Sequence, residues 1–414
     1  MEITEKLILM RILFLTLSNI NSVNESGIYQ DLLREFLSNG HQIDVMSPIE
    51  RRHNKKTHII YENDCKIVKI KTLNTQKTNF FEKTISLLVL NKLFTKAYLL
   101  FLGKNKYDII IISTPPITLN NFLNKIKKTN SAFVYLLLKD IFPQNAVDLN
   151  IIKSGSLTHR FFLTKEDRLY SISDKIGCMS PANRDYLINN NYINKDKVEI
   201  NANSVNLDRL LNIEKINRFN VRQKYKIPID STCILFGGNL GKPQGIPNLI
   251  KAIDSCKKID NLFFIIVGEG TYYQTLLNWV SNSRSENVKV ISYLPKLEYL
   301  NLVGSVDVGL ISLDHRFTIP NFPSRLLSYL ERKKPVLIFS DRATDIGRIA
   351  EDNNFGFFAA SDNPADFFTT VKKIKMNQLS LSQMGHNGYN FMLKNYTTAI
   401  AYEKIIEAKK GVEI

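Results

Sequence analysis

The feature that most constrains this chain is the alternation of short apolar runs with longer periodic segments along its whole length. Strands buried inside a parallel sheet are continuous apolar runs, and the helices that connect them carry one apolar stripe. The alternation therefore predicts an α/β fold, in which helices cover both faces of a mostly parallel sheet. Strands are predicted at residues 11–17, 41–46, 108–112, 132–138, 176–178, 233–236, 262–267, 288–291, 308–311 and 335–338. Helices between them are predicted, for example, at 29–38, where Gly40 fits the residue after the helix end, and at 246–254, 272–280 and 323–332.

The length of the chain, 414 residues, exceeds what one hydrophobic core usually organises, so two domains are expected. Each half begins with a strand, a loop of small residues and a helix. We expect two Rossmann-like, doubly wound domains that face a central cleft, with any ligand beyond the carboxyl ends of the strands. The predicted parts are a first domain at 1–208, a polar linker at 209–230, a second domain at 231–392, and a C-terminal helix at 393–414 that packs back on the first domain.

The net charge of +16 comes from basic residues spread through the whole chain, and it favours an acidic partner. Nucleic acid, anionic lipid and phosphorylated substrates all fit this charge, which does not choose among them. The sequence carries no RNA-binding signature with interleaved aromatic residues, so no nucleic-acid partner is expected. The four cysteines lie far apart without a metal-ligand spacing, which predicts reduced thiols in a cytosolic protein, no zinc site and no disulfide framework.

The sequence contains no run of 18 uncharged apolar residues, so no transmembrane helix is expected. The nearest approach is the stretch 80–102, which includes Lys92 and Lys96 among its apolar residues. Two interpretations stay open for it: an amphipathic helix at a membrane surface, or a core helix of the first domain. The apolar N-terminal stretch is interrupted by Arg11 and is interpreted as a buried strand, not as a signal peptide.

A glycine-rich loop, "FGGNLGKPQG" at 236–245, stands between a predicted buried strand and a predicted helix. Glycines let a backbone approach a ligand closely, and the start of a helix offers N–H groups to an anion. Lys242 adds a full positive charge. The loop has neither the P-loop order nor the G-x-G-x-x-G order, so it is read as either a phosphate-binding loop or a tight turn.

A second candidate site is "IPNFPSRLLSYLERKKPVLIF" at 319–339. Asn321 is expected to cap a helix, which places Ser324 and Arg325 at its start and Ser328 on the same face. An arginine in this position suits bidentate phosphate binding; the alternative is an ordinary surface arginine. Together with the glycine-rich loop, it favours a ligand with a diphosphate group.

Two carboxylates follow predicted strands. Asp140 comes after the strand at 132–138, where it can accept a proton or position a hydroxyl group, or simply begin a turn before Pro143. Glu269 lies in "VGEG", where it can contact a polar ligand or only complement a helix dipole.

Taken together, these segments resemble the bacterial retaining glycosyltransferases of GT-B fold, specifically family 4 and its O-antigen, capsule and amino-sugar branch, with a fucosamine-transferase-like pattern. The resemblance spans nearly the whole chain. It rests on ordered segments, among them "LSNGHQIDV", "KDIFPQNAV", "YSISDKIGCMSPANRDYL", "KVEINANSVN", "GGNLGKPQGIPNLIKAI", "VGEG" and "FPSRLLSYLERKKPVLIF".

The resemblance implies that the second domain holds a nucleotide-sugar donor. The positions matching the family's donor-binding segments, apart from Arg325, are Gly27, Gly238, Asn239, Lys242, Gln244 and, facing the nucleobase, Tyr293 and Leu294. Arg325 stands where many relatives have a phosphate-binding lysine. Two departures matter: the family's Glu-(seven residues)-Glu pair reads Pro320 and Ser328 here, and the family's cleft histidine is absent, which leaves Asp140 as the nearest catalytic candidate.

The implied activity is transfer of a sugar, with retention, from a nucleotide sugar such as a UDP-sugar to a polyprenyl-diphosphate-linked saccharide during surface polysaccharide synthesis. Lys242 and Arg325 are expected to stabilise the leaving group while Asp140 orients or deprotonates the acceptor. We expect no metal or other cofactor, and a peripheral location on anionic lipid at the cytoplasmic face of the plasma membrane. The alternatives are a UDP-sugar 2-epimerase with the same architecture and a non-catalytic basic scaffold.

Overall fold

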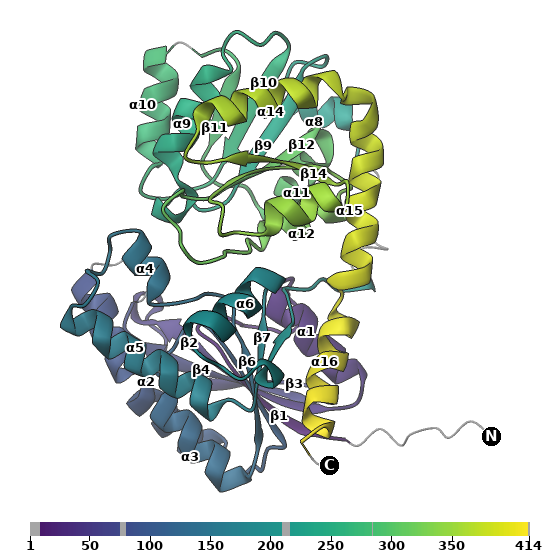
Figure 1. Cartoon of the computed structure of the whole chain (residues 1–414). Helices are drawn as coiled ribbons and strands as arrows, with labels where there is room; N and C mark the ends of the chain where they lie inside the picture. The colour runs from purple at the N-terminus through teal and green to yellow at the C-terminus, as the bar shows by residue number, and fades with distance from the viewer. Residues whose placement is uncertain (1–8, 75–79, 209–215, 284, 413–414) are drawn as a thin grey trace. The chain divides into compact units, whose positions relative to one another are not determined.

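The computed structural model describes residues 9–74, 80–208, 216–283 and 285–412, without the side chains of 80–85. The chain divides into two compact units (Figure 1). Unit 1 comprises Met1–Val147, Ile152–Leu207 and Thr397–Ile414, and unit 2 comprises Asp148–Ile151 and Asp208–Tyr396. Each unit is built on one sheet with helices on both faces, which confirms the predicted α/β fold.

Unit 1 contains an eight-stranded sheet in the order β3-β4-β2-β1-β5-β6-β7-β8. All of its strand pairs are parallel except β3 with β4. The strands are β1 (Arg11–Leu15), β2 (Gln42–Glu50), β3 (His58–Glu62), β4 (Cys65–Thr72), β5 (Ile109–Ser113), β6 (Phe133–Leu137), β7 (Lys175–Cys178) and β8 (Val198–Ile200). The sequence pattern did not predict β3, β4 and β8. Of these, β4 has lysines at three of its eight positions, which hides its apolar character.

The helices of the first part of the chain are α1 (Ile28–Ser38), α2 (Phe80–Phe101), α3 (Asn120–Asn130), α4 (Gln144–Asp148), α5 (Leu157–Ile172) and α6 (Pro181–Asn190). The final helix, α16 (Thr398–Lys410), also belongs to unit 1 and packs beside α1 (Figure 1). The rings of Phe36 and Tyr402 meet edge to face with centroids 4.9 Å apart, and Thr398 Oγ1 donates to Glu35 Oε2 at 2.6 Å. As predicted, Gly40 follows the end of α1, with the left-handed φ of +83° that glycine adopts readily.

Unit 2 contains a six-stranded, wholly parallel sheet in the order β11-β10-β9-β12-β13-β14. The strands are β9 (Thr232–Gly237), β10 (Leu262–Val267), β11 (Val288–Ile291), β12 (Val308–Ser312), β13 (Val336–Ser340) and β14 (Gly356–Ala360). The helices are α8 (Arg218–Lys224), α9 (Ile246–Ser255), α10 (Tyr273–Ser283), α11 (Lys296–Ser305), α12 (Arg325–Glu331), α13 (Ile346–Asp352), α14 (Pro364–Met376) and α15 (Leu381–Asn395). The strand β14 is an addition to the predicted set.

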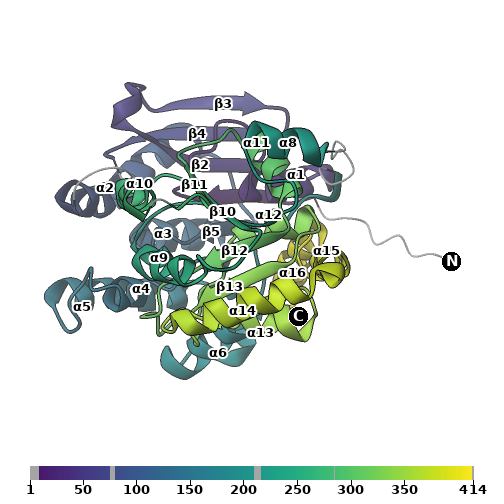
Figure 2. The same cartoon turned by 90° about the horizontal axis from the view of Figure 1, so that it is seen from above.

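The core of unit 2 forms where strands that are buried at every position meet the apolar stripes of α9 and α14. Every residue of β9 and β10 is buried, as expected for central strands of a parallel sheet. The helices α9 and α14 lie side by side (Figure 2), and they bring Leu249, Ile253, Phe367 and Val371 into the same core.

The predicted linker at 209–230 is partly wrong. Residues 209–215 lie outside the described residues, but the rest contains α8, which begins at the capping residue Asn217 and packs on α11. Its Arg222 is 1% exposed and donates to the carbonyl oxygens of Pro228, Ile229, Ser231 and Ser305. A polar composition therefore concealed a segment that is folded onto unit 2 through a buried arginine.

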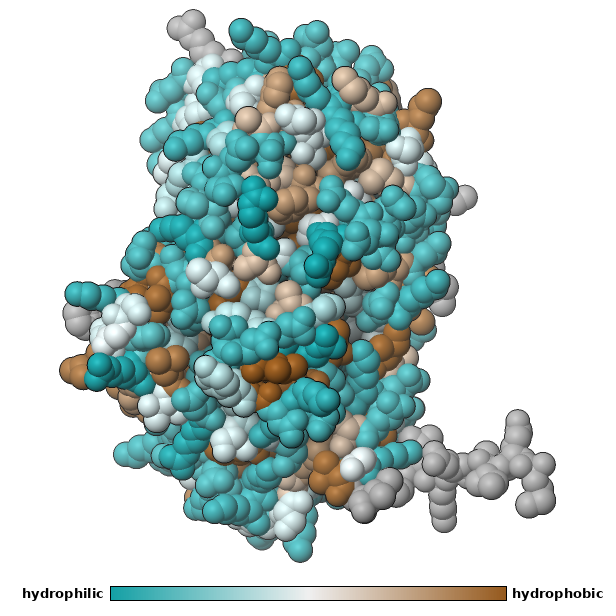
Figure 3. All heavy atoms as spheres, in the orientation of Figure 1, coloured by the Kyte–Doolittle hydropathy of each residue, from teal (hydrophilic) through white to brown (hydrophobic). Residues whose placement is uncertain are grey.

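The stretch 80–102 forms α2, whose side chains from Ser86 onward divide into two faces. Leu90, Phe94 and Ala97 are buried, and the ring of Phe94 meets that of Phe122 on α3 with centroids 6.2 Å apart. The opposite face exposes Leu88, Lys92, Lys96, Leu99 and Leu100. The part of the chain that the structure describes contains no helix that could span a lipid bilayer. The face of the molecule in Figure 3 is mostly hydrophilic, with hydrophobic residues in small groups.

Candidate functional site

The glycine-rich loop follows β9 at the carboxyl edge of the unit 2 sheet, and hydrogen bonds fix its course. The N–H of Gly238 donates to Val267 O, and the N–H of Leu240 donates to Glu269 O, both at 2.8 Å. Gly238 has φ +138° and Gly245 has φ +58°, both in the region that favours glycine. The loop therefore holds a fixed shape that other residue types would strain.

The side chains of the loop take different roles. Gln244 accepts a hydrogen bond from the N–H of Gly241 at 3.2 Å, and its Oε1 lies 3.5 Å from Asn239 Nδ2, so its amide stabilises the loop itself. Lys242 begins a short 3₁₀ turn at 242–244, and its side chain is exposed. Asn239 is also exposed. Asn239 and Lys242 are therefore the residues of this loop whose polar side chains are exposed at this edge.

Arg325 is the strongest feature of the site, because it reaches from α12 to this loop. Its Nη1 donates to Gly237 O at 2.6 Å, and its guanidinium carbon lies 4.9 Å from the centre of the Phe236 ring. A Cβ at Gly238 would lie 2.4 Å from Arg325 Nη2, so glycine is needed where the guanidinium passes. Burial lowers the pKa of Arg325, and among the described residues no carboxylate forms an ion pair with it. The guanidinium thus brings an uncompensated positive charge to the loop.

The start of α12 differs from the prediction. The helix begins at Arg325 with Ser324 in the capping position, and Asn321 donates to Ile319 O at 3.3 Å instead of capping the helix. The cause is Pro323, which disfavours helical backbone at the residue before it. Ser324 is exposed and Ser328 is half-buried, with Ser328 one turn after Ser324.

Three other predicted residues lie in loops at the same edge. Glu269 is exposed in the loop after β10, where its backbone holds Leu240. Tyr293 and Leu294 follow β11, and the Tyr293 side chain is 68% exposed. Because β11, β10, β9 and β12 are neighbours in this order, their carboxyl ends form one continuous edge. The structure therefore gathers the predicted donor residues of unit 2 along one edge of one sheet.

The two candidate residues of unit 1 lie at the carboxyl edge of its own sheet. Asp140 follows β6, where its Oδ1 accepts from Asn145 Nδ2 at 2.7 Å and its N–H lies 3.3 Å from Thr114 Oγ1. Gly27 directly precedes α1 with an extended φ of −173°. The predicted cleft between the domains stays a prediction.

Two lysines of unit 1 escaped the sequence analysis. Lys139, beside Asp140, donates to Asn201 O at 3.2 Å, and burial lowers its pKa to about 7. Lys69 on β4 is fully buried and donates to Ile20 O at 2.8 Å and Ser47 Oγ at 3.0 Å, which anchors the loop between β1 and α1. The available signal was a lysine inside or at the end of an apolar run. Within the described part of the chain, no cluster of three or more His, Cys, Asp or Glu residues is arranged to hold a metal ion.

Comparison with known proteins places these observations in a family context. Residues 217–391 match the family model "Glycosyl transferases group 1", a span from α8 into α15. The chain is also 21% identical, over 309 residues, to the probable glycosyltransferase WbjE of Pseudomonas aeruginosa, with 72% of this chain and 73% of that protein covered.

Solved structures with similar folds cover nearly the whole chain. Sucrose-phosphate synthase from Thermosynechococcus elongatus superposes with a TM-score of 0.76 at 14% identity, covering 97% of this chain and 99% of that one. Anabaena HepE in complex with UDP superposes with a TM-score of 0.68 at 13% identity, covering 97% of this chain and 100% of that one. An E. coli trehalose-6-phosphate protein bound to UDP-2-fluoro glucose superposes with a TM-score of 0.73 at 12% identity, covering 96% of this chain and 99% of that one. These likenesses confirm the predicted fold, two Rossmann-like domains as in GT-B glycosyltransferases.

Proposed function

We propose that this protein is a glycosyltransferase that moves a sugar from a nucleotide-sugar donor, and that unit 2 holds the donor. The observation that carries the proposal is Arg325, a half-buried guanidinium with no carboxylate partner among the described residues, packed against a fixed glycine-rich loop. The match of residues 217–391 to group 1 glycosyl transferases supports it, since that span contains both features. The UDP complexes of similarly folded proteins favour a UDP-sugar as donor.

In the proposed mechanism, the donor diphosphate lies against the loop and Arg325. Arginine provides a planar set of donors for phosphate oxygens, and Lys242 adds a second positive charge at the loop. Negative charge grows on the nucleoside diphosphate as its bond to the sugar breaks. Fixed positive charge that opposes this growth stabilises the transition state more than the ground state, which accelerates the reaction.

The remaining roles are assigned by the same proposal. Tyr293 and Leu294 face the nucleobase, and Ser328 bonds to a ribose hydroxyl in place of the glutamate that relatives use. In unit 1, Asp140 orients or deprotonates the acceptor hydroxyl, which attacks the same face of the sugar that the nucleotide leaves. Gly27 allows donor and acceptor to approach the start of α1. No metal is needed, because the protein's own cations provide the charge.

A donor screen tests the proposed function directly. We expect one of a set of UDP-, GDP- and dTDP-sugars, N-acetylated amino and deoxy sugars included, to raise the melting temperature, and UDP itself to bind. Slow release of free sugar in the absence of acceptor would agree with a transferase. Conversion of the donor into its 2-epimer would instead identify an epimerase, and a chain that binds no nucleotide sugar at physiological salt would overturn the proposal.

We further propose that the acceptor is a polyprenyl-diphosphate-linked saccharide in O-antigen or capsule synthesis, reached at an anionic membrane surface. Support comes from the net charge of +16 and from the face of α2 where Lys92 and Lys96 stand among exposed Leu88, Leu99 and Leu100. Such a face suits the boundary between lipid headgroups and acyl chains.

Vesicle sedimentation tests this membrane contact. We expect binding to vesicles that contain anionic lipid, weakened by salt and by Leu99→Glu, while Leu379→Glu, a change at a fully exposed leucine of unit 2, leaves binding unchanged. Equal binding to neutral and anionic vesicles at all salt concentrations would contradict the proposal.

A further inference from the structure

A polar cavity lies in unit 2, at the edge of the sheet opposite the glycine-rich loop. It has a volume of about 390 Å³, and it is lined where β9, β12 and β13 begin and where α15 begins. Its polar lining includes Arg218, Thr232, Asp307, Lys333, Lys334 and Ser382. None of these residues belongs to the proposed donor site.

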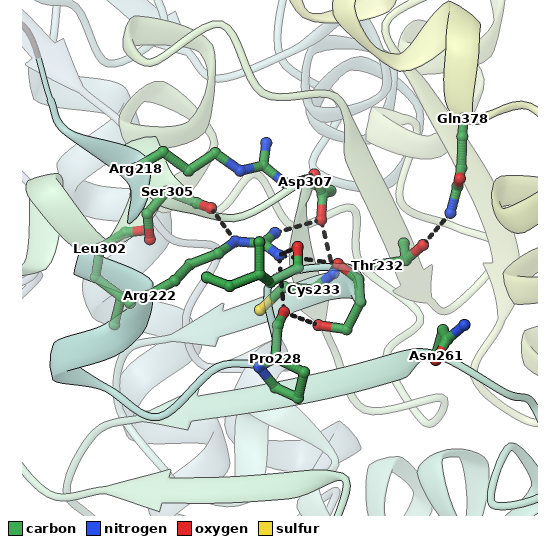
Figure 4. A network of polar contacts seen from close by, with 12 residues as sticks. Arg218, Arg222, Pro228, Thr232, Cys233, Asn261, Leu302, Ser305, Asp307 and Gln378 are labelled. Atoms are coloured by element: carbon green, nitrogen blue, oxygen red, sulfur yellow. Dashed lines mark hydrogen bonds and ion pairs between the residues drawn. The ribbon is translucent and has the colours of Figure 1, made fainter. Parts of the chain in front are cut away.

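Positive charge exceeds negative charge around this cavity. Asp307 uses one oxygen to bind Arg218 Nη2 at 2.6 Å and the other to bind Arg222 Nη2 at 2.7 Å, as Figure 4 shows. The same second oxygen accepts from the N–H of Cys233 at 2.8 Å. The carboxylate is therefore fully engaged by two arginines. The other carboxylate of the lining, Asp230, is exposed, and the lining contains two further cations, Lys333 and Lys334.

Lys334 is the cation of this cavity that an anionic ligand would stabilise most. Among the described residues, none accepts a hydrogen bond from its ammonium group, although the side chain is largely covered. The pKa of Lys334 is lowered to about 8, mainly by burial and also by repulsion from Arg218 and Arg222, although Asp307 and Cys233 act in the opposite direction. A cation placed among cations without a partner is unfavourable unless a ligand offsets it.

A simpler explanation is that Lys333 and Lys334 follow α12 and complement its carboxyl end. However, the N–H groups of these two residues already serve that end, donating to Leu330 O at 3.0 Å and Tyr329 O at 2.9 Å. This explanation also leaves Arg218, which comes from α8, and the cavity itself unaccounted for.

We propose that this cavity binds a small phosphate-bearing anion, at a site separate from the proposed donor site. Arginine and lysine approach it from different elements, and Thr232 Oγ1 accepts from Gln378, which leaves the Thr232 hydroxyl hydrogen available to donate. Donors that converge from several directions suit an anion with several oxygens. The helix α12 runs between the two edges of the sheet, with Arg325 at its first position and Lys333 and Lys334 just beyond its end.

The test uses inorganic pyrophosphate as the probe and titration calorimetry of the full chain. Because pyrophosphate would also bind at the donor site, the measurement is made in the Arg325→Ala background. We expect about one equivalent to bind there, and Lys334→Met in that background to weaken binding roughly tenfold or more, the loss of one charge-assisted contact. The control Lys258→Met removes an exposed lysine of the same unit and is expected to change nothing.

Equal pyrophosphate affinity with and without Lys334→Met would overturn the inference. Proton uptake offers a second readout: near pH 8 an anion should raise the pKa of Lys334, so binding takes up protons in the parent and none in the Lys334→Met variant. The absence of this uptake would also overturn it. UDP binding, measured separately in the Lys334→Met single variant, is expected to match the wild type. If UDP does not bind the wild type, the proposed function is wrong, whereas the pyrophosphate result at this cavity is unaffected.

Discussion

Replacement of Arg325 by alanine is expected to abolish most turnover while the fold stays intact. The change removes the 2.6 Å hydrogen bond to Gly237 O and the contact with the Phe236 ring. A hydrogen bond from a charged donor contributes about 1.5–3 kcal/mol, but the variant also relieves the burial of an uncompensated cation. These terms oppose each other, so we expect the stability to change by about 1 kcal/mol or less, which corresponds to about 4 °C or less in Tm.

For donor binding, the loss of Arg325 is not offset by an opposing gain. Loss of one charge-assisted contact with phosphate of about 1.5–3 kcal/mol predicts a Kd for UDP weakened by roughly 10- to 150-fold. Because the charge on the leaving group grows in the transition state, turnover should fall further, by about 10²- to 10³-fold. Arg325→Lys keeps the charge and should retain more activity than alanine.

Calorimetry with UDP, a transfer or donor-hydrolysis assay and thermal unfolding measure the three quantities. The control is Arg348→Ala, which removes an exposed arginine of the same unit. If Arg325→Ala melts like the wild type and turns over at a near-normal rate, Arg325 does not stabilise the leaving group and the assignment of the donor site fails.

Three further changes test other parts of the structure. Gly238→Ala should weaken UDP binding by at least about tenfold, because the φ of +138° and the 2.4 Å approach of Arg325 leave no room for a methyl group. The fold should remain intact by circular dichroism. Unchanged UDP affinity would show that the shape of the loop does not matter for donor binding. Arg222→Met should destabilise unit 2 by about 3–5 kcal/mol in urea unfolding, because four backbone carbonyl oxygens lose their buried donor and Asp307 keeps only its contact with Arg218. A loss below about 1 kcal/mol would refute that role. The folded-state pKa of Lys334, about 8, lies below its ordinary 10.5, so its unfavourable effect on stability is full below about pH 8 and fades as the pH rises toward 10.5. Lys334→Met should therefore stabilise the chain more at about pH 7 than at about pH 10, and an equal effect at both would contradict the shift.

The strands and loops of unit 2 were predictable because their signals are local. The apolar runs that form β9, β10 and β12 are continuous and short, and the glycines after β9 mark the turn at its end. Lys242 and Arg325 are candidates on this pattern, since residues after parallel strands share one edge, whereas Asn239, Gln244, Tyr293 and Leu294 are implied only by the family resemblance. The pattern failed at β4, where lysines interrupt the apolar run, and at α8, whose polar surface resembles a linker.

The sequence by itself determined the fold class, the alternation of strands and helices, and the residue types at the carboxyl edge of each sheet, because periodicity and turn chemistry depend on neighbours in the chain. Only the tertiary structure decided which distant residues meet. Arg325 contacts Gly237, 88 positions away, and Arg222 reaches Asp307, 85 positions away. The burial of Lys69 and the cavity beside Lys334 likewise arise from elements that come together only in the folded chain. Burial and charge balance depend on these long-range contacts, which local composition does not encode.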